Sequence, residues 1–185
     1  SIAAAGNASD VVTLLKAGSD DARSYALWAL SLSISSENQA IVLDEGAVKP
    51  LVAYLTNVGQ TEREQAASAL ARLALGNGDA QLAIAKAGAI SHLILMLDAD
   101  TNVATAQEFA AASLAELALL PDSRTTIVMT GGIIPFVALL REGRNDGKKF
   151  AASALARLAH EQDETAAEIA RAGAVSPLVG LLNGD

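Results

Sequence analysis

Side chains that could carry out acid–base, metal or phosphate chemistry are few in this sequence and lie far apart. The two histidines, His92 and His160, stand at an expected helix start and an expected helix end, where histidine is usually a surface or capping residue. Acidic pairs such as Asp20 and Asp21 lie at helix ends or linkers, where solvated charge is ordinary. The absence of cysteine excludes disulfides and zinc–thiolate sites. We therefore expect no catalytic centre, no metal site and no cofactor.

One stretch resembles a phosphate-binding loop, but its spacing is wrong. Gly143 to Lys148 has one residue too few between its glycines, and Lys149 stands where such a loop requires Ser or Thr. The stretch also joins two expected helices and does not follow a strand. We interpret it as a linker.

Charge and composition narrow the class of protein further. The net charge of −8 without a basic stripe argues against nucleic acid as a partner. No apolar run approaches the roughly 20 residues that span a bilayer, and no signal-peptide pattern begins the chain. This balance indicates the cytosol or the nucleus. A chain with 51% hydrophobic but only 3% aromatic residues favours closely packed helices rich in Ala and Leu.

The elements that must position any functional side chain form a repeat. The segments GAVKPLVAYL, GAISHLILML, GGIIPFVALL and GAVSPLVGLL begin at Gly46, Gly88, Gly131 and Gly173 and align without gaps. A weaker copy, GNASDVVTLL, begins at Gly6, so that successive copies are 40 to 43 residues apart. A period of this length indicates an array of helical repeats.

Each copy predicts a first helix that is the shortest of its repeat, a turn at the glycine and a second helix. The first helix contributes one apolar residue four positions before each glycine: Ile2, Val42, Ile84, Ile127 and Ile169. Glycine suits the left-handed residue that ends such a helix. In three copies a proline follows in the first turn of the second helix, where a missing N–H costs little: Pro50, Pro135 and Pro177. His92 and Asp10 take this place in the other two.

The second helix should present two apolar columns to the core. The first contains Val11, Leu51, Leu93, Phe136 and Leu178, and the second contains Leu15, Leu55, Leu97, Leu140 and Leu182. A polar linker then leads to a third, longer helix: YALWALSLS, QAASALARLA, FAAASLAELA and FAASALARLA. The buried column of the third helices is Leu30, Leu70, Leu114 and Leu155. It follows the second-helix leucine by 15, 15, 17 and 15 residues, so the linker at 98–107 holds two extra residues.

We therefore divide a single array, residues 1–185, into repeats that stack on one another. The divisions are a partial repeat 1–34, repeats of about 36–76, 78–120 and 122–161, and a partial repeat 163–185. One repeat cannot bury its apolar faces alone, so neighbours must stack. The chain opens inside a first helix and closes before a third one. We expect either a piece of a longer array or ends that stack head to tail between molecules.

This pattern resembles the armadillo repeat over essentially the whole chain. That family shows a first helix ending in A-G-G or A-G-A, then I-P-x-L-V-x-L-L, then a third helix of the W-A-L-S-N-L-A type. The resemblance implies an all-α fold, a right-handed α-solenoid of stacked three-helix repeats whose third helices line a concave face. HEAT repeats are the nearest alternative, but they have two helices and lack the glycine and proline positions.

The resemblance also implies where a partner binds. We expect it on the solvent-facing positions of the third helices, the third-helix stripe: Tyr25, Trp28, Leu32, Ser68, Arg72, Phe109, Ala112, Glu116, Phe150, Ser153 and Arg157. In the importin-α branch, repeated Trp and Asn hold a lysine-rich peptide, but only Trp28 matches here. Aromatic residues beside a row of alternating charge instead predict a groove for an extended or helical segment of mixed charge. The alternative is that Phe109 and Phe150 pack under the following linker and the charges are solvated.

The functional prediction is a non-catalytic scaffold that binds a protein or peptide segment along the concave face. It involves no nucleic acid and no direct membrane insertion. One alternative is the substrate-recruiting armadillo region of a larger enzyme, such as a U-box ubiquitin ligase. Another is a structural or tethering array that self-associates end to end.

Overall fold

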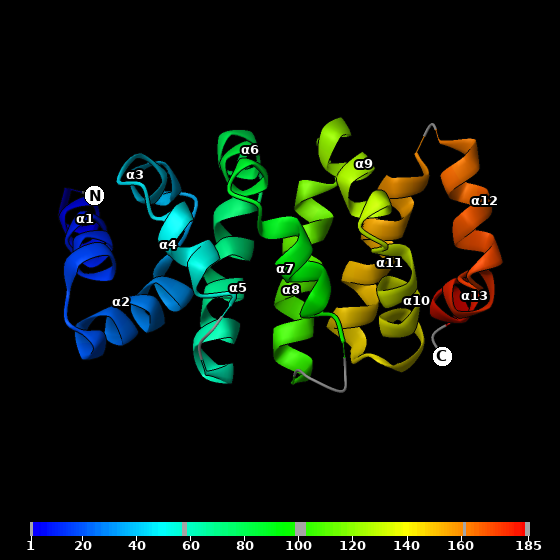
Figure 1. Cartoon of the computed structure of the whole chain (residues 1–185), viewed down its shortest axis with the longest axis horizontal. Helices are drawn as coiled ribbons and strands as arrows, with labels where there is room; N and C mark the ends of the chain where they lie inside the picture. Colours follow the sequence, from blue (N-terminus) through cyan, green and yellow to red (C-terminus); the bar gives the residue numbers. More distant parts are fainter. Residues whose placement is uncertain (1, 57–58, 99–102, 161, 184–185) are drawn as a thin grey trace. The chain divides into compact units, whose positions relative to one another are not determined.

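In a computed structural model, the chain is built from α-helices joined by short turns (Figure 1). The structure describes residues 2–56, 59–98, 103–160 and 162–183, and in these residues it contains 13 α-helices and no strand. This confirms the all-α prediction. The side chain of Ile2 and residues 99–102 of the linker predicted at 98–107 lie outside the described residues. The chain forms two compact units, residues 1–89 and 90–185.

The N-terminal unit is organised around the two long helices α2 and α5, which lie side by side. Its helices are α1 (Ile2–Ala17), α2 (Asp20–Ser33), α3 (Gln39–Asp44), α4 (Val48–Ala53), α5 (Gln60–Ala74) and α6 (Gly78–Lys86). Helix α1 packs against α2 and α3, and α4 packs against α5 and α6. The core of this unit is aliphatic and includes Leu27, Leu30, Leu51, Leu70 and Leu73, all buried.

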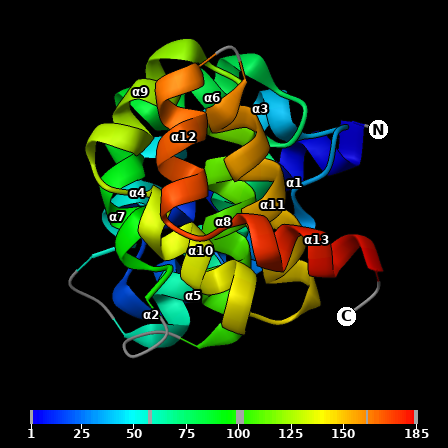
Figure 2. The ribbon, with the colours of Figure 1, turned by 90° about the vertical axis from the view of Figure 1, so that its right-hand side faces the viewer.

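The C-terminal unit repeats this plan around α8 and α11. Its helices are α7 (Ala89–Leu95), which begins at the boundary, α8 (Ala104–Leu117), α9 (Pro121–Met129), α10 (Ile133–Glu142), α11 (Asn145–Ala159), α12 (Asp163–Arg171) and α13 (Val175–Asn183). Helix α10 packs against α11, α12 and α13. Figure 2, viewed from the side of α12 and α13, shows the chain turning sharply between these two helices. Phe136, Leu114 and Leu155 are buried here.

The turns between first and second helices are as the sequence predicts. The glycines at these turns have φ between 77° and 87°: Gly46, Gly88, Gly131 and Gly173. Three prolines occupy the third position of the following helix: Pro50 in α4, Pro135 in α10 and Pro177 in α13. Proline in a first turn removes an N–H that has no helical partner, so the new helix can begin there without loss.

The first, weak copy departs from the prediction. Gly6 does not end a helix, because α1 runs unbroken from Ile2 to Ala17. No proline follows at Asp10, so that residue keeps the N–H that a continuous helix needs. The continuous helix also changes the register, and the buried residue of the first column is Val12, with Val11 only partly buried.

Two further expectations are wrong. The first helix is not always the shortest of its repeat, since α6 has nine residues and α7 has seven. The end of α7 tightens into i→i+3 hydrogen bonds from Met96 and Leu97, which shortens its regular part. In the last copy, Leu182 is 87% exposed although it belongs to an expected core column. In the described part of the chain no third helix follows α13 to cover it.

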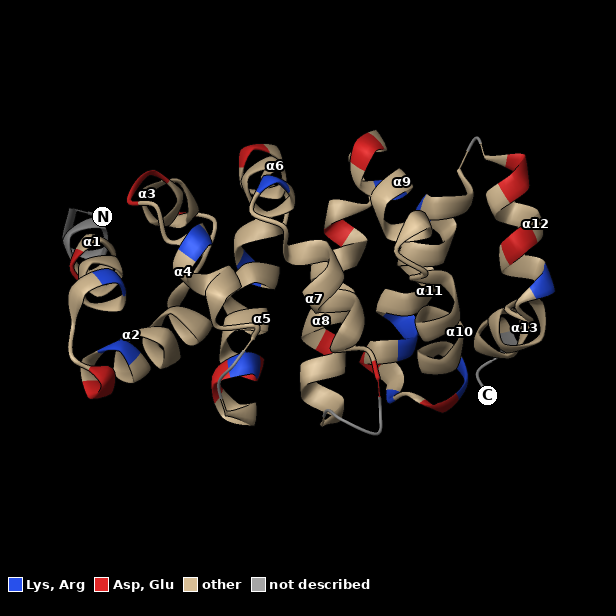
Figure 3. Ribbon diagram, in the orientation of Figure 1, with Lys and Arg blue, Asp and Glu red and all other residues tan. Residues whose placement is uncertain are grey.

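Charged residues gather at helix ends and not along the long helices (Figure 3). Asp79 lies in the first turn of α6, Asp122 in that of α9 and Asp163 in that of α12. Carboxylates at these positions interact favourably with the positive end of the helix dipole. These acidic residues therefore have a local structural role.

Candidate functional site

Three residues of the third-helix stripe share one face of α2. Ser19 caps the start of this helix, its hydroxyl oxygen accepting a hydrogen bond from a backbone N–H of the first turn. The spacing of three and seven residues then places Tyr25, Trp28 and Leu32 above one another. Tyr25 is 73% exposed, Trp28 54% and Leu32 58%. The structure thus places a row of large apolar side chains at the surface of the N-terminal unit.

The neighbouring helix α5 presents a different surface. Ser68, expected on the solvent-facing stripe, is buried, and its hydroxyl donates to the backbone carbonyl of Ser31 at 3.2 Å. This correction follows from the packing of α2 against α5, which covers Ser68. Arg72, one turn later, is exposed. The N-terminal unit therefore carries an apolar row on α2 and an exposed cation on the neighbouring helix α5.

The two aromatic residues of the stripe in the C-terminal unit are partly covered. Phe109 of α8 is half-buried, and Phe150 of α11 is 37% exposed. Ala112 and Ser153, one turn further along the same helices, are also half-buried. Both rings thus retain accessible surface while part of each packs against its neighbours.

The charges of the C-terminal unit pair with each other. Arg157 of α11 donates to the Glu116 carboxylate of α8 at 3.1 Å, and the two side chains are 30% and 15% exposed. The same guanidinium nitrogen also donates to the backbone carbonyl of Ala115. Two members of the row of alternating charge therefore join α8 to α11, and they are less available to a partner than the expectation assumes.

Buried glutamines are polar residues that the sequence interpretation misses. Gln39 donates to two backbone carbonyls at the end of α5, Gln81 donates to one further carbonyl there, and Gln107 donates to the carbonyl of Leu97. Glutamine in a first helix or at a helix start looks like a surface residue in a sequence. Only their occurrence within otherwise apolar segments could have indicated burial.

The described residues offer no arrangement for metal or phosphate chemistry. No group of three or more His, Asp or Glu side chains could hold a metal ion within them. Asn145 to Lys148, part of the stretch that resembles a phosphate-binding loop, belongs to the first turn of α11. Among the described residues, no single helix is long and apolar enough to cross a membrane. Only the pair α9 and α10, bent by 83°, reaches that length and apolar composition when the two are taken together.

Comparison with known proteins decides the family. No family model matches the chain. A structure of computationally designed armadillo repeat proteins for modular peptide recognition is 29% identical, with a TM-score of 0.81, and the match covers 94% of this chain and 74% of that one. A designed armadillo repeat protein in complex with the peptide (KR)4 is 28% identical, with a TM-score of 0.80 and coverage of 95% and 74%. An engineered protein is 32% identical, with a TM-score of 0.81 and coverage of 95% and 72%.

The chain belongs to the armadillo repeat family. This confirms the resemblance drawn from the glycine and proline positions and from the third-helix sequences. The designed armadillo repeat protein named above holds a strongly basic peptide. The armadillo repeats of the present chain carry Arg72 and Arg157 on their third helices, and Glu116 is engaged by Arg157.

Proposed function

We propose that this armadillo repeat chain is a non-catalytic scaffold that binds a segment of a partner protein on its third-helix stripe. The observation that supports this most is the exposed apolar row on α2, Tyr25, Trp28 and Leu32. Contiguous large apolar residues at a surface are typical of interaction sites, and Tyr and Trp are common anchors. The fold does not require them there, because the opposite face of α2 already supplies Leu27 and Leu30 to the core. The similarity to armadillo repeat proteins designed for peptide recognition supports the same function.

The charges near these anchors indicate the kind of segment. Arg72 is exposed on the helix beside α2, and it has no ion pair among the described residues. In the C-terminal unit, Glu116 and Arg157 satisfy each other. We infer that the partner segment is largely apolar or aromatic, with an acidic residue positioned for Arg72. A lysine-rich or arginine-rich segment would be repelled there.

Truncating the anchors tests this proposal. Tyr25→Ala with Trp28→Ala, and separately Phe109→Ala with Phe150→Ala, should each weaken partner capture by about tenfold or more, since anchor residues at interfaces cost upwards of about 1 kcal/mol when removed. Capture is measured by quantitative pull-down against the wild-type chain, followed by titration calorimetry with the captured segment. Helicity and Tm should stay close to those of the wild type.

A control variant separates binding from general surface hydrophobicity. Met129→Ala removes an apolar side chain that is 83% exposed on the first helix α9, away from the stripe, and should leave capture unchanged. If the aromatic variants capture the same partners as the wild type, the stripe is not the binding surface. If Phe109→Ala with Phe150→Ala unfolds the chain, these rings belong to the core and the stripe has to be redrawn without them.

A further inference from the structure

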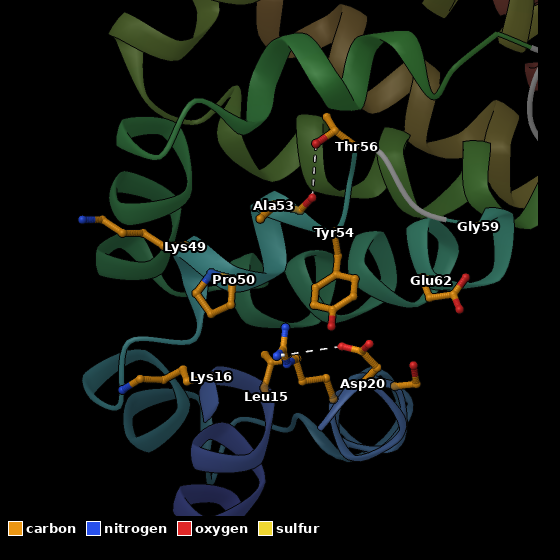
Figure 4. Close-up of a pocket in the computed structure, with 12 residues that line it drawn as sticks. Leu15, Lys16, Asp20, Lys49, Pro50, Ala53, Tyr54, Thr56, Gly59 and Glu62 are labelled. Atoms are coloured by element: carbon orange, nitrogen blue, oxygen red, sulfur yellow. Dashed lines mark hydrogen bonds and ion pairs between the residues drawn. The ribbon is translucent and has the colours of Figure 1, made fainter. Parts of the chain in front are cut away.

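A cleft recurs at one place in the repeat, beside the proline of the second helix. In the C-terminal unit, one such cleft lies next to Pro135 of α10 and another next to Pro177 of α13, with volumes of about 280 and 400 Å³. The matching cleft of the N-terminal unit, next to Pro50 of α4, has a volume of about 840 Å³. We name it the α4 cleft, and its lining includes Leu15, Lys16, Lys49, Pro50, Tyr54 and Glu62 (Figure 4).

Two side-chain differences between repeats account for the size of the α4 cleft. In the C-terminal unit, Leu139 is buried, and its Cδ1 would lie 3.1 Å from a β-carbon placed on Gly147, eight residues later. The corresponding pair in the N-terminal unit is Tyr54 and Glu62. Gly147 has no β-carbon, so Leu139 can pack against it, whereas Glu62 carries a full side chain at the corresponding position. Tyr54 therefore stays half-buried and forms one wall of the cleft, its ring extending from α4 toward the start of α2 (Figure 4).

The charged residues of the α4 cleft are distributed unevenly. In Figure 4, Lys16 and Lys49 lie at one side, and Asp20 and Glu62 lie at the other. Asp20 is 3.8 Å from the guanidinium of Arg23, which moderates its charge. Lys16 donates one hydrogen bond of 3.0 Å to a backbone carbonyl, and Lys49 has no hydrogen bond or ion pair within the described residues. Figure 4 shows both side chains extending away from Tyr54, at the edge of the cleft. An ammonium group has three donors, so both lysines can still bind a carboxylate there.

Between these charged sides the α4 cleft is mainly apolar, and Arg23, Ser24 and Thr56 contribute polar groups to its lining. Leu15 is buried at its edge, and Pro50, Ala53 and the ring of Tyr54 complete the wall. The lining follows α4 along its six residues, which rise about 9 Å. An extended peptide advances about 3.3 Å per residue, so about three residues span this length. The volume also falls within the range of about 300 to 1,000 Å³ that is typical of ligand pockets.

We propose that the α4 cleft is a second binding site, which takes an extended peptide segment with an acidic residue at one end and apolar residues after it. The carboxylate binds Lys16 and Lys49, and the apolar side chains pack on Pro50 and Tyr54. Glu62 on the other side repels a second acidic residue, which fixes the orientation of the segment. No residue of the third-helix stripe lines this cleft, so the site goes beyond the proposed function.

Selection from a phage-displayed library of random twelve-residue peptides on the whole chain tests the proposal. Selected peptides are synthesised with a fluorescein label and titrated by fluorescence polarisation. We expect one class whose affinity falls about tenfold or more with Ala53→Trp, which fills the cleft, and with Lys49→Glu, which reverses its charge. Sequences of this class should carry Asp or Glu next to leucine or an aromatic residue.

Matched controls come from elsewhere in the chain. Ala138→Trp adds the same ring at the corresponding exposed position of α10, and Lys86→Glu reverses an exposed lysine of α6. Both should leave the affinity of this class within about twofold, and circular dichroism should show native helicity for both tryptophan variants. Tyr25→Ala with Trp28→Ala should have no effect on it either, so that failure of the stripe and failure of the cleft are distinguishable.

Three results would overturn the proposal. One is a selection in which no peptide responds to Ala53→Trp or Lys49→Glu. Another is a responding class without acidic residues. The third is an equal loss with Lys86→Glu and Lys49→Glu, which would show that only the overall charge of the chain matters.

Discussion

Gly88 illustrates how a single residue determines the path of the chain. It ends α6 with φ of 80°, and no atom lies within 4 Å of the place that a β-carbon would take. The cost of adding this carbon is therefore backbone strain and not a collision. Gly78, at the start of the same helix, also has open space around it but lacks a positive φ. The two glycines therefore differ in backbone conformation but not in the space around them.

Gly88→Ala should lower the free energy of unfolding by about 1 to 2 kcal/mol, the usual cost of an L-residue in the left-handed region. Gly78→Ala should be neutral or raise it by up to about 1 kcal/mol, because alanine restricts the unfolded chain more than glycine does. Urea unfolding followed by circular dichroism measures both. Equal effects of the two substitutions would contradict the strain explanation.

The residues of the candidate site were only partly predictable at this scale. Helical periodicity places Tyr25 and Trp28 on one face, and both are exposed. The same periodicity says nothing about the neighbouring helix, so it misses the burial of Ser68 against α2. It also misses the pair of Glu116 and Arg157, which are 41 residues apart in the chain. Contacts between helices depend on packing distances that a one-dimensional pattern does not contain.

At the scale of elements, buried glutamines fasten the end of one helix to the start of another. Gln39, in the first turn of α3, donates at 2.7 Å and 2.9 Å to the carbonyls of Arg72 and Leu75, where α5 ends. The last carbonyls of a helix have no partner within it, so a side-chain amide satisfies them. This bond links two elements that are distant in sequence, and it holds the orientation of α5 relative to α3.

Gln39→Met keeps the size of the side chain but removes its donor. We expect the free energy of unfolding to fall by about 1 to 3 kcal/mol, because buried carbonyls lose their partner. Gln60→Met, at the exposed start of α5, should change it by less than about 0.5 kcal/mol. Thermal and urea unfolding of the two variants provide the comparison. A Gln39→Met chain as stable as the wild type would mean that these bonds contribute nothing.

The order of the elements was largely predictable, because it depends on local signals. Glycine and proline mark the turns, and the leucine columns mark the buried sides of the third helices. Prediction fails in the first copy, where Gly6 stands without a proline after it and the helix continues. It also misses the α4 cleft. Tyr54 and Glu62 occupy ordinary positions in their helices, and their effect appears only when α1, α2 and α4 surround them.

At the scale of the whole molecule, identical sequence positions have different surroundings in different repeats. Three apolar positions of the second-helix segment are buried in or directly after α4 and α7 and within α10: Val48, Val52 and Leu55, then Ile90, Ile94 and Leu97, then Ile133, Val137 and Leu140. In α13 the same positions, Val175, Val179 and Leu182, are 57%, 51% and 87% exposed. The pattern within a repeat is the same in all copies, so only the stacking of neighbours makes the difference.

Stability should therefore vary along the array for one and the same substitution. Leu140→Ala removes a side chain that is 1% exposed in a unit where α11, α12 and α13 all pack against α10, and it should cost about 2 to 5 kcal/mol of unfolding free energy. Leu182→Ala, at the matching position of α13, should cost less than about 0.5 kcal/mol. Urea unfolding at low protein concentration measures both. A comparable loss in the two variants would mean that the face of α13 is covered in solution, and sedimentation at rising concentration would then show whether a second copy of the chain covers it.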